Sequence, residues 1–507
     1  MTDTVQNRGA ITACVILAVV MQALDTTIAN VALPYIQGSV SASADQINWV
    51  LTSYIVAAAI MTPPSGFLAA RFGSKRVLMV AIVGFVAASV LCGLAQSLFQ
   101  IVAFRLMQGF FGAALVPIAQ SVLLDIYTQE ERGSAMALFG ISVMVGPVLG
   151  PVIGGWLTDH LSWRWVFYIN VPIGALAFGG ISVFMRTDAT VGGGRMDWLG
   201  FGSLSIAIAA MQVALDRGAQ LDWFSSLEII IEATLAVSAF YIFLVHTFTA
   251  KHSFVDPRLF LDRNFTLGII FIFIFVVGVT YLASMALLTP YLQTLMGYPI
   301  VTAGIVMGPR GLGTMVCMFM IGRMIGKVDT RVLLLIGLLL TAWAMNDMTG
   351  WTPAVSQWTI ATTGFVQGAG LGFLFVPLSV VTFATIDPAK RGDGTGLYNL
   401  SRNIGSSVGI SVVSYLLTRN GQINHATIGE YVTATNREAQ HANRALSPFT
   451  AAGRAALDAV IQNQAAIISY IDDFKLMMVM TMAAIPLLLL LRTAPAGDPG
   501  EHAMVME

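Results

Sequence analysis

Long apolar stretches recur along the whole chain, separated by short polar segments. A transmembrane helix needs about 20 mostly apolar residues. The stretch at residues 47–70, for example, has no charged residue between Asp45 and Arg71. The pattern predicts an all-α membrane protein with fourteen spanning helices, at residues 11–34, 47–70, 77–95, 98–124, 134–157, 165–185, 198–215, 228–246, 265–290, 301–322, 331–349, 357–384, 394–418 and 471–492.

The first stretch is too long for a signal peptide, and no small-residue cleavage site follows it before the second stretch. We therefore expect it to be an uncleaved spanning helix.

Lysines and arginines are distributed unevenly between the two sets of loops. If the chain starts inside, the cytoplasmic segments hold sixteen of them, and the short outer loops hold two, Arg164 and Arg217. The long segment 419–470 holds four more, but long translocated loops are largely exempt from the positive-inside rule. Both termini are therefore predicted to be cytoplasmic. Segment 419–470 is predicted to lie outside, as a solvated cap or as a docking surface for another protein.

Composition agrees with a membrane protein and excludes several other classes. Hydrophobic residues make up 56% of the 507 positions and charged residues 10%, against roughly 25% charged in soluble domains. The net charge of −1 leaves no basic face for nucleic acid. The three cysteines are far apart in apolar stretches, and no histidine lies deep in a span. The sequence therefore predicts no disulfide, no metal site and no cofactor.

An internal repeat divides the chain into two halves. Three dipeptides recur in order at an offset of 259 or 260 residues, which indicates a duplication. Six spans need fewer residues than this offset, so the spans at 198–215 and 228–246 are predicted to be an inserted hairpin. The expected domains are 1–187, 188–258 and 259–507, with substrate bound between the two bundles near the membrane midplane. The matching pairs are Gln108-Gly109 with Gln367-Gly368, Val116-Pro117 with Val376-Pro377, and Arg132-Gly133 with Arg391-Gly392.

Asp25 lies inside the first apolar stretch, where an unpaired carboxylate costs several kcal/mol. Arg105 lies in the fourth stretch. With a rise of about 1.5 Å per residue, the two residues are roughly 15 and 10 Å from the outer ends of their spans. Similar depth and opposite charge make them candidate partners in proton coupling. The alternative is that Arg105 only holds helices together.

Several motifs carry a family resemblance that covers essentially the whole chain. Residues 24–34 resemble the first-helix signature of fourteen-helix drug:proton antiporters of the major facilitator superfamily, of the EmrB/QacA type. Residues 215–218 and 221–226 of the inserted hairpin are most similar to the EmrB branch, and residues 101–109 resemble the fourth-helix motif whose arginine handles protons.

This resemblance implies a major facilitator fold with two six-helix bundles and an inserted hairpin. It implies a proton-coupled exporter of hydrophobic or amphipathic compounds, which works by alternating access in the inner membrane. In a cell with two membranes it also implies a periplasmic adaptor protein and an outer-membrane channel as partners.

Two further motifs are expected to govern conformational change. Residues 66–76 resemble the superfamily's loop between helices two and three, although Ala70 stands where the family usually has aspartate. Its glycines permit close packing and a sharp turn, and its cations face the cytoplasm or only set the topology. The motif residues are Gly66, Arg71, Gly73, Lys75 and Arg76.

Residues 140–155 resemble the fifth-helix motif of antiporters and end at Gly155. Gly146, Gly150 and Gly154 form a small face for close helix packing, and Pro147 and Pro151 are expected to bend the helix. We expect this face at the interface between the halves. The alternative is ordinary glycine packing.

Arg310 and Arg402 are two further arginines inside predicted spans, whereas Asp25 is the one clear deep carboxylate. This excess of cations favours lipophilic weak acids or anions over dications as substrates. Core packing is the alternative for the aromatic candidates. The candidate cavity residues are Arg310, Arg402, Asn30, Gln108, Phe373 and Phe375.

Two other classes of function predict different sequence features from those of an exporter. A facilitator or symporter importing a small nutrient predicts more polar side chains in the spans and does not need Asp25. A membrane enzyme or receptor predicts a metal cluster, a phosphate-binding loop or a nucleophile, and the sequence offers none of these in a suitable context.

Overall fold

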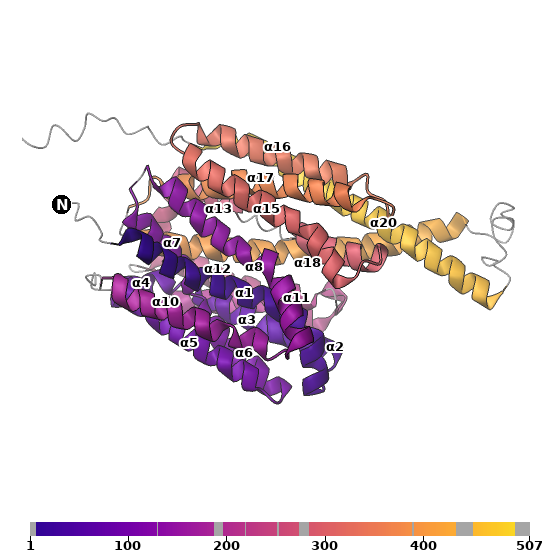
Figure 1. Ribbon diagram of the computed structural model, residues 1–507, viewed down its shortest axis with the longest axis horizontal. Helices are drawn as coiled ribbons and strands as arrows, with labels where there is room; N and C mark the ends of the chain where they lie inside the picture. The colour runs from indigo at the N-terminus through magenta and orange to yellow at the C-terminus, as the bar shows by residue number, and fades with distance from the viewer. Residues whose placement is uncertain are drawn as a thin grey trace, which may run out of the picture.

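The computed structural model describes residues 7–128, 130–186, 196–218, 220–250, 253–272, 283–387, 390–431 and 450–491, and helices dominate them (Figure 1). The helices are α1 (Arg8–Val40), α2 (Ala44–Ile47), α3 (Trp49–Met61), α4 (Ser65–Phe72), α5 (Ser74–Leu94), α6 (Leu98–Gly112), α7 (Leu115–Ile126), α8 (Arg132–His160), α9 (Trp165–Tyr168), α10 (Asn170–Phe184), α11 (Trp198–Arg217), η1 (Trp223–Ser225), α12 (Leu227–Thr249), η2 (Pro257–Leu261), α13 (Arg263–Ile270), α14 (Ala283–Pro290), η5 (Tyr291–Leu295), α15 (Ile300–Met324), α16 (Thr330–Met348), α17 (Gln357–Phe383), α18 (Arg391–Tyr431), α20 (Ala451–Ala483) and η8 (Ile485–Leu490).

The described residues contain eleven helices that are long and apolar enough to cross a membrane, or twelve when the bent pair α3 and α4 counts as one span. The described residues therefore agree with an all-helical, multi-span membrane protein, while the count of fourteen stays a prediction. Part of the ninth predicted span, residues 273–282, lies outside the described residues. The thirteenth predicted span, within α18, carries Asn399, Arg402 and Asn403 and is correspondingly more polar.

The second predicted span is broken. Helices α3 and α4 meet at an angle of 54°. Pro63 and Pro64 lie between them, and neither can donate a backbone hydrogen bond to continue α3. The uniform apolar composition of residues 47–70 predicted a single helix, but the two prolines divide it.

The two halves lie side by side with roughly parallel helices. In Figure 1, α5, α6 and α10 form the lower part, α15, α16 and α17 the upper part, and α1, α8 and α18 run between them. Within the halves, α1 packs on α8 and α3 on α6, and α15 and α16 both pack on α17.

The internal repeat is visible in this packing. Gly109 of α6 lies against the backbone carbonyl of Tyr54 in α3, so a Cβ there would clash. Gly368, its counterpart in the repeat, lies in the same way against the backbone carbonyl of Arg310 in α15. The α3–α6 contact of the first half thus corresponds to the α15–α17 contact of the second.

At one end of the molecule, here called the basic end, α4 and α15 end and α5, α8 and α18 begin. At or beside these helix ends lie Arg71, Lys75, Arg132, Arg323 and Lys390. The basic end lies at the left of Figure 1. The two halves are closed against each other at this end through two glycine contacts related by the repeat. A Cβ on Gly66 of α4 would lie 2.5 Å from the carbonyl carbon of Gly392 in α18. A Cβ on Gly133 of α8 would lie 2.9 Å from the carbonyl oxygen of Gly322 in α15.

Hydrogen bonds and ring packing reinforce the closure of the basic end. Three hydrogen bonds join described residues of the two halves there, and Phe139 of α8 stacks on Phe375 of α17 with ring centroids 6.4 Å apart. The bonds run from Arg391 Nη1 to Asp125 Oδ1 (3.0 Å), from Asn399 Nδ2 to Gln120 Oε1 (2.8 Å), and from Ser134 Oγ to the carbonyl of Gly322 (3.2 Å).

The inserted hairpin, α11 and α12, contacts both halves near the opposite end. Asp216 of α11 accepts a hydrogen bond from the Thr52 hydroxyl of α3. Ser411 Oγ of α18 donates to the carbonyl of Leu215, at 2.9 Å. The insertion therefore lies over the junction between α3 of the first half and α18 of the second.

Helices α18 and α20 continue past the bundle as two arms at the right of Figure 1. The arms pack on each other, and His425 Nε2 lies 2.9 Å from Asp458 Oδ1. The sequence predicted an extramembrane segment over 419–470, and its described parts belong to the helices α18 and α20. Residues 432–449, including His441, lie outside the described residues.

Candidate functional site

Asp25 lies near the middle of α1 with its side chain 1% exposed. Three donors from two other helices reach its carboxylate. Arg105 Nη1 of α6 donates to Oδ2 at 2.7 Å. Gln108 Nε2 of α6 and Asn170 Nδ2 of α10 donate to Oδ1 at 2.7 and 2.8 Å. The charge-assisted bond to the arginine and the two amide bonds together replace the water that an ionised carboxylate requires.

Arg105 is held as firmly as the acid, and it is also 1% exposed. Its Nε donates to the carbonyl of Val50 at 3.1 Å, and its Nη1 also donates to Gln108 Oε1 at 2.8 Å. The guanidinium carbon lies 4.3 Å from the centroid of the Tyr54 ring, in cation–π geometry. The fixed position of the guanidinium depends on α3, whose residues supply both the carbonyl and the ring.

Two members of this cluster were not identified from the sequence. Asn170 donates both to Asp25 and, at 2.9 Å, to Ser89 Oγ of α5. Ser89 in turn donates to the carbonyl of Phe167 at 2.8 Å. Asn170 is fully buried at the start of an apolar helix, and that position in an apolar stretch is the signal that could have identified it.

The cluster joins one buried carboxylic acid to one buried permanent cation. Protonation of Asp25 would remove its charge and leave the Arg105 guanidinium without its counter-ion. Both residues are buried in a low-dielectric interior, so that change in charge has a large effect on the energy of the surrounding helices. A carboxyl with these partners can therefore couple gain or loss of a proton to a change in helix packing.

The glycine motif of α8 packs directly behind this site. A Cβ on Gly146 would clash with the backbone of Ala23, and one on Gly150 with the side chain of Thr27. Gly154 lies against Ile28. The sequence placed this face at the interface between the halves, but its partner is α1 of the same half.

Other positions of α8 face the second half. Gly140 lies against Met318 and Phe375, and Val148 lies against Gly311 of α15. One side of α8 therefore contacts the helix that carries Asp25, and another side contacts the second half. Gly155 has open space beside it, and Pro147 and Pro151 lie within the continuous helix Arg132–His160.

The second half carries a counterpart of the Asp25 site without the acid. Ser284 of α14 lies 259 residues after Asp25, the same offset that separates Gln108 from Gln367. Gln367 Nε2 donates to Ser284 Oγ at 3.2 Å, as Gln108 does to Asp25. Arg310 Nη2 also donates to Ser284 Oγ, at 2.7 Å. The arginine comes from the position equivalent to Tyr54, and Gly364 occupies the position equivalent to Arg105.

The remaining cavity candidates occupy different environments. Arg310 is buried, whereas Asn30 is exposed on α1. Arg402 is half-buried on α18, and its Nη1 has no hydrogen-bond partner among the described residues. Phe375 is fully buried against Phe139, so in this conformation it seals the two halves together and does not line a cavity. Phe373 is half-buried beside the same apolar core.

The turn between α4 and α5 forms at Gly73. Gly73 has a φ of 87°, a left-handed conformation that glycine adopts without strain. Lys75 Nζ donates to the carbonyl of Ser182 at 2.8 Å, which ties α5 to α10. Arg71 and Arg76 are exposed, and the Arg71 guanidinium lies 5.7 Å from the centroid of the Phe72 ring.

Comparisons with known proteins agree with this architecture. The sequence model of the Major Facilitator Superfamily matches residues 15–410. Fatty acid resistance protein FarB of Neisseria gonorrhoeae is 38% identical over 420 residues, which cover 82% of this chain and 82% of that protein. Multidrug export protein EmrB of Escherichia coli (strain K12) is 35% identical over 435 residues, covering 84% of this chain and 83% of that protein.

Solved structures share the fold at much lower identity. The human organic anion transporter MFSD10 (TETRAN) matches with a TM-score of 0.60 and 15% identity, covering 93% of this chain and 99% of that chain. The proton:xylose symporter XylE matches with a TM-score of 0.57 and 14% identity, covering 96% and 99%. The family match and the two relatives above 30% identity lead to one conclusion: the chain belongs to the major facilitator superfamily, in its EmrB-like branch.

Proposed function

We propose that this protein is a proton-coupled multidrug exporter of the inner membrane, which exchanges hydrophobic or amphipathic compounds for protons by alternating access. The observation that carries the proposal is the buried Asp25, held by Arg105, Gln108 and Asn170. The relatives named FarB and EmrB support export of more than one kind of compound.

In this scheme Asp25 binds a proton from the outside and releases it to the inside. The closed basic end corresponds to the state that faces outward, with the basic loops and both termini in the cytoplasm, as the positive-inside rule predicts. Protonation removes the charge that holds Arg105, and the resulting change in the α1, α3 and α6 contacts favours the opposite arrangement of the halves. Arg105 then stabilises the ionised form once the proton has left.

Amphipathic anions and weak acids are the proposed preferred substrates. From Asn264 to Val328 the sequence contains no aspartate or glutamate, and this stretch includes the buried Arg310. Ser284 occupies the position equivalent to Asp25, so the counterpart of the Asp25 site in the second half has no carboxylate at that position. Arg310 and Arg402 together would attract a substrate's anionic group, and the name of the relative FarB points to fatty acids as one such class.

A periplasmic adaptor protein and an outer-membrane channel are proposed partners where the cell has two membranes. The arms of α18 and α20 extend beyond the bundle on the side opposite the basic end, so they are the part of the chain that such an adaptor would reach first.

Transport by purified protein in liposomes tests the proposal. An imposed pH gradient should drive accumulation of anilinonaphthalene sulfonate, an amphipathic anion that carries no proton itself, and a proton ionophore should abolish it. Arg310→Gln should lower the rate for this anion more than for the cation tetraphenylphosphonium. Accumulation that does not depend on the pH gradient would contradict proton coupling. If Arg310→Gln lowers the transport rates of the anion and the cation equally, the proposed substrate preference is wrong.

A further inference from the structure

The inserted hairpin carries a motif that the coupling site does not use. Residues 215–218 and 221–226 are the segments of this hairpin that resemble the EmrB branch. The structure uses the first of these segments to join the halves through Asp216 and Leu215. The second segment forms one wall of an open groove of about 600 Å³ at the end opposite the basic end.

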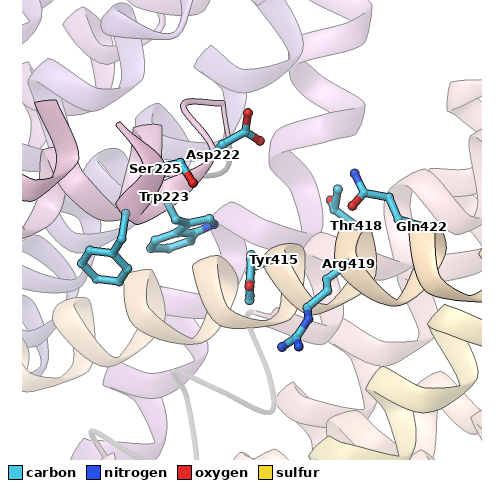
Figure 2. A pocket seen from close by; sticks show the side chains of 8 residues that line it. Asp222, Trp223, Ser225, Tyr415, Thr418, Arg419 and Gln422 are labelled. Atoms are coloured by element: carbon cyan, nitrogen blue, oxygen red, sulfur yellow. The ribbon is translucent and has the colours of Figure 1, made fainter. Parts of the chain in front are cut away.

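The other wall of this groove is a single face of α18. Tyr415, Thr418, Arg419 and Gln422 are spaced at i, i+3, i+4 and i+7, so they project from the same side of the helix. Figure 2 shows the Trp223 side chain directed toward Tyr415 from the loop above α18. The Trp223 and Tyr415 ring centroids are 5.5 Å apart in an edge-to-face arrangement.

The loop adopts an unusual backbone conformation to form this wall. Asp222 and Trp223 have φ values of 53° and 52°, in the left-handed region that bulky residues rarely occupy. Such strain persists where the surrounding structure requires it and is concentrated at functional sites. Here it turns the Trp223 indole inward and the Asp222 carboxylate away from Tyr415 (Figure 2).

The groove combines aromatic surface with hydrogen-bond donors. Phe224 is 69% exposed and extends the aromatic wall. The Trp223 indole N–H is buried and has no acceptor among the described residues. A buried donor without a partner loses the hydrogen bond it would make to water. The Arg419 guanidinium and the Thr418 and Gln422 side chains add donors along α18.

From this geometry we infer that the groove between residues 222–225 and 415–422 is a binding site for an amphipathic monoanion such as a medium-chain carboxylate. The apolar part of the ligand lies on the Trp223, Phe224 and Tyr415 rings, and its carboxylate accepts from Arg419. Pockets of several hundred Å³ with apolar walls and a few polar groups are typical for small molecules. The choice of ligand class rests on the proposed function, because the exported compound is released at this end of the protein.

Photolabelling tests this site without any proton gradient. The full chain in lipid nanodiscs is irradiated with a diazirine derivative of dodecanoate, and the labelled peptides are identified by mass spectrometry. We expect labelling within 218–226 and 415–422 that unlabelled dodecanoate displaces. Trp223→Ala and Arg419→Gln should each reduce this labelling at least fivefold, and the diazirine derivative of dodecanol should label these segments less than the acid.

Two variants serve as matched controls. Trp358→Ala removes another exposed tryptophan, and Arg454→Gln removes an arginine on the α20 arm; both should leave the labelling unchanged. Labelling that unlabelled dodecanoate does not displace, or that is the same in Trp223→Ala, Arg419→Gln and the wild type, would overturn the proposal. Because binding is read without transport, a protein that fails the pH-gradient assay still gives a decisive answer about the groove.

Discussion

Asp25 and Arg105 form a buried ion pair, and separating the two charges costs free energy. Each is 1% exposed, and each depends on the other for neutralisation. Removing one partner of a buried pair leaves an uncompensated charge, which typically destabilises a protein by about 3–5 kcal/mol, whereas replacing both is often nearly neutral. In the proposed function, protonation of Asp25 would remove this neutralisation and so alter the packing of the helices around the pair.

Thermal unfolding of single and double charge variants in detergent measures how far each residue of the pair depends on the other. Asp25→Asn and Arg105→Gln should each lower the melting temperature markedly. The double variant Asp25→Asn with Arg105→Gln should recover most of the loss, because no buried charge remains, yet it should still not couple transport to protons. Single variants as stable as the wild type, or a double variant whose loss equals the sum of the single losses, would contradict the account of the pair.

Much of this cluster could be predicted from the sequence, and the reason is electrostatic. A charge inside an apolar stretch is rare, so Asp25 and Arg105 stood out, and helix rise placed them at similar depth. Asn170, Ser89 and Ser284 could not be selected in the same way. Neutral polar residues are common in spans, and only the tertiary structure distinguishes those that touch the acid from those that satisfy their own helix.

For helix α8, too, the sequence indicated a contact surface but not the contact partner. Its glycine spacing correctly indicated a face for close approach, but spacing does not say which helix approaches. The partner is α1, so the motif fixes the helix that carries Asp25. The position of the inserted hairpin between the two halves could not be predicted from the sequence either. The contacts of Asp216 and Leu215 with different bundles produce no periodic pattern of residues.

Helix α8 also offers a matched pair of substitutions. A Cβ at Gly146 would meet the Ala23 backbone, whereas Gly155 on the same helix has open space beside it. Gly146→Ala should cost roughly 1–3 kcal/mol through overpacking and should slow transport by displacing α1. Gly155→Ala should leave both the melting temperature and the transport rate near those of the wild type. Equal behaviour of the two variants would argue against close α1–α8 packing as the support of the site.

For the whole molecule, the contacts that close the basic end include a carboxylic acid, Asp393. Asp393 lies in the first turn of α18 beside Gly392, at the seam with α4. Burial raises the pKa of Asp393 to about 6, the nearby Asp256 carboxylate adds to the increase, and Lys390 opposes it. Lys390 is itself paired with Asp256 at 2.5 Å, and Arg391 with Asp125.

The sign of the resulting pH dependence follows from comparing the closed and open states. Opening hydrates Asp393, and its pKa then returns toward about 3.9. Below pH 4 both states are protonated and the group has no effect. As the pH rises toward 6 the open state loses its proton first, so the closed state becomes less favoured, and above pH 6 the effect is constant.

Thiol accessibility measures this effect. A Ser134→Cys variant at the α8–α15 seam, with Cys14, Cys92 and Cys317 replaced by serine, is labelled by an impermeant reagent with and without Asp393→Asn. The ratio of the two rates cancels the thiol's own pH dependence. Between pH 5 and 7.5, the labelling rate with Asp393 divided by the rate with Asp393→Asn should rise by up to about tenfold. A ratio independent of pH would remove Asp393 from the control of the basic end.

The central claim is that Asp25 carries the exchanged proton, and proton movement driven by substrate tests it most directly. Liposomes that contain the protein and an internal pH-sensitive dye are exposed to anilinonaphthalene sulfonate with no initial pH gradient. With the wild type, anion entry should drive protons out and raise the internal pH. With Asp25→Asn, the internal pH should stay constant even if the anion still enters. A rise in internal pH with Asp25→Asn equal to that of the wild type would contradict the account.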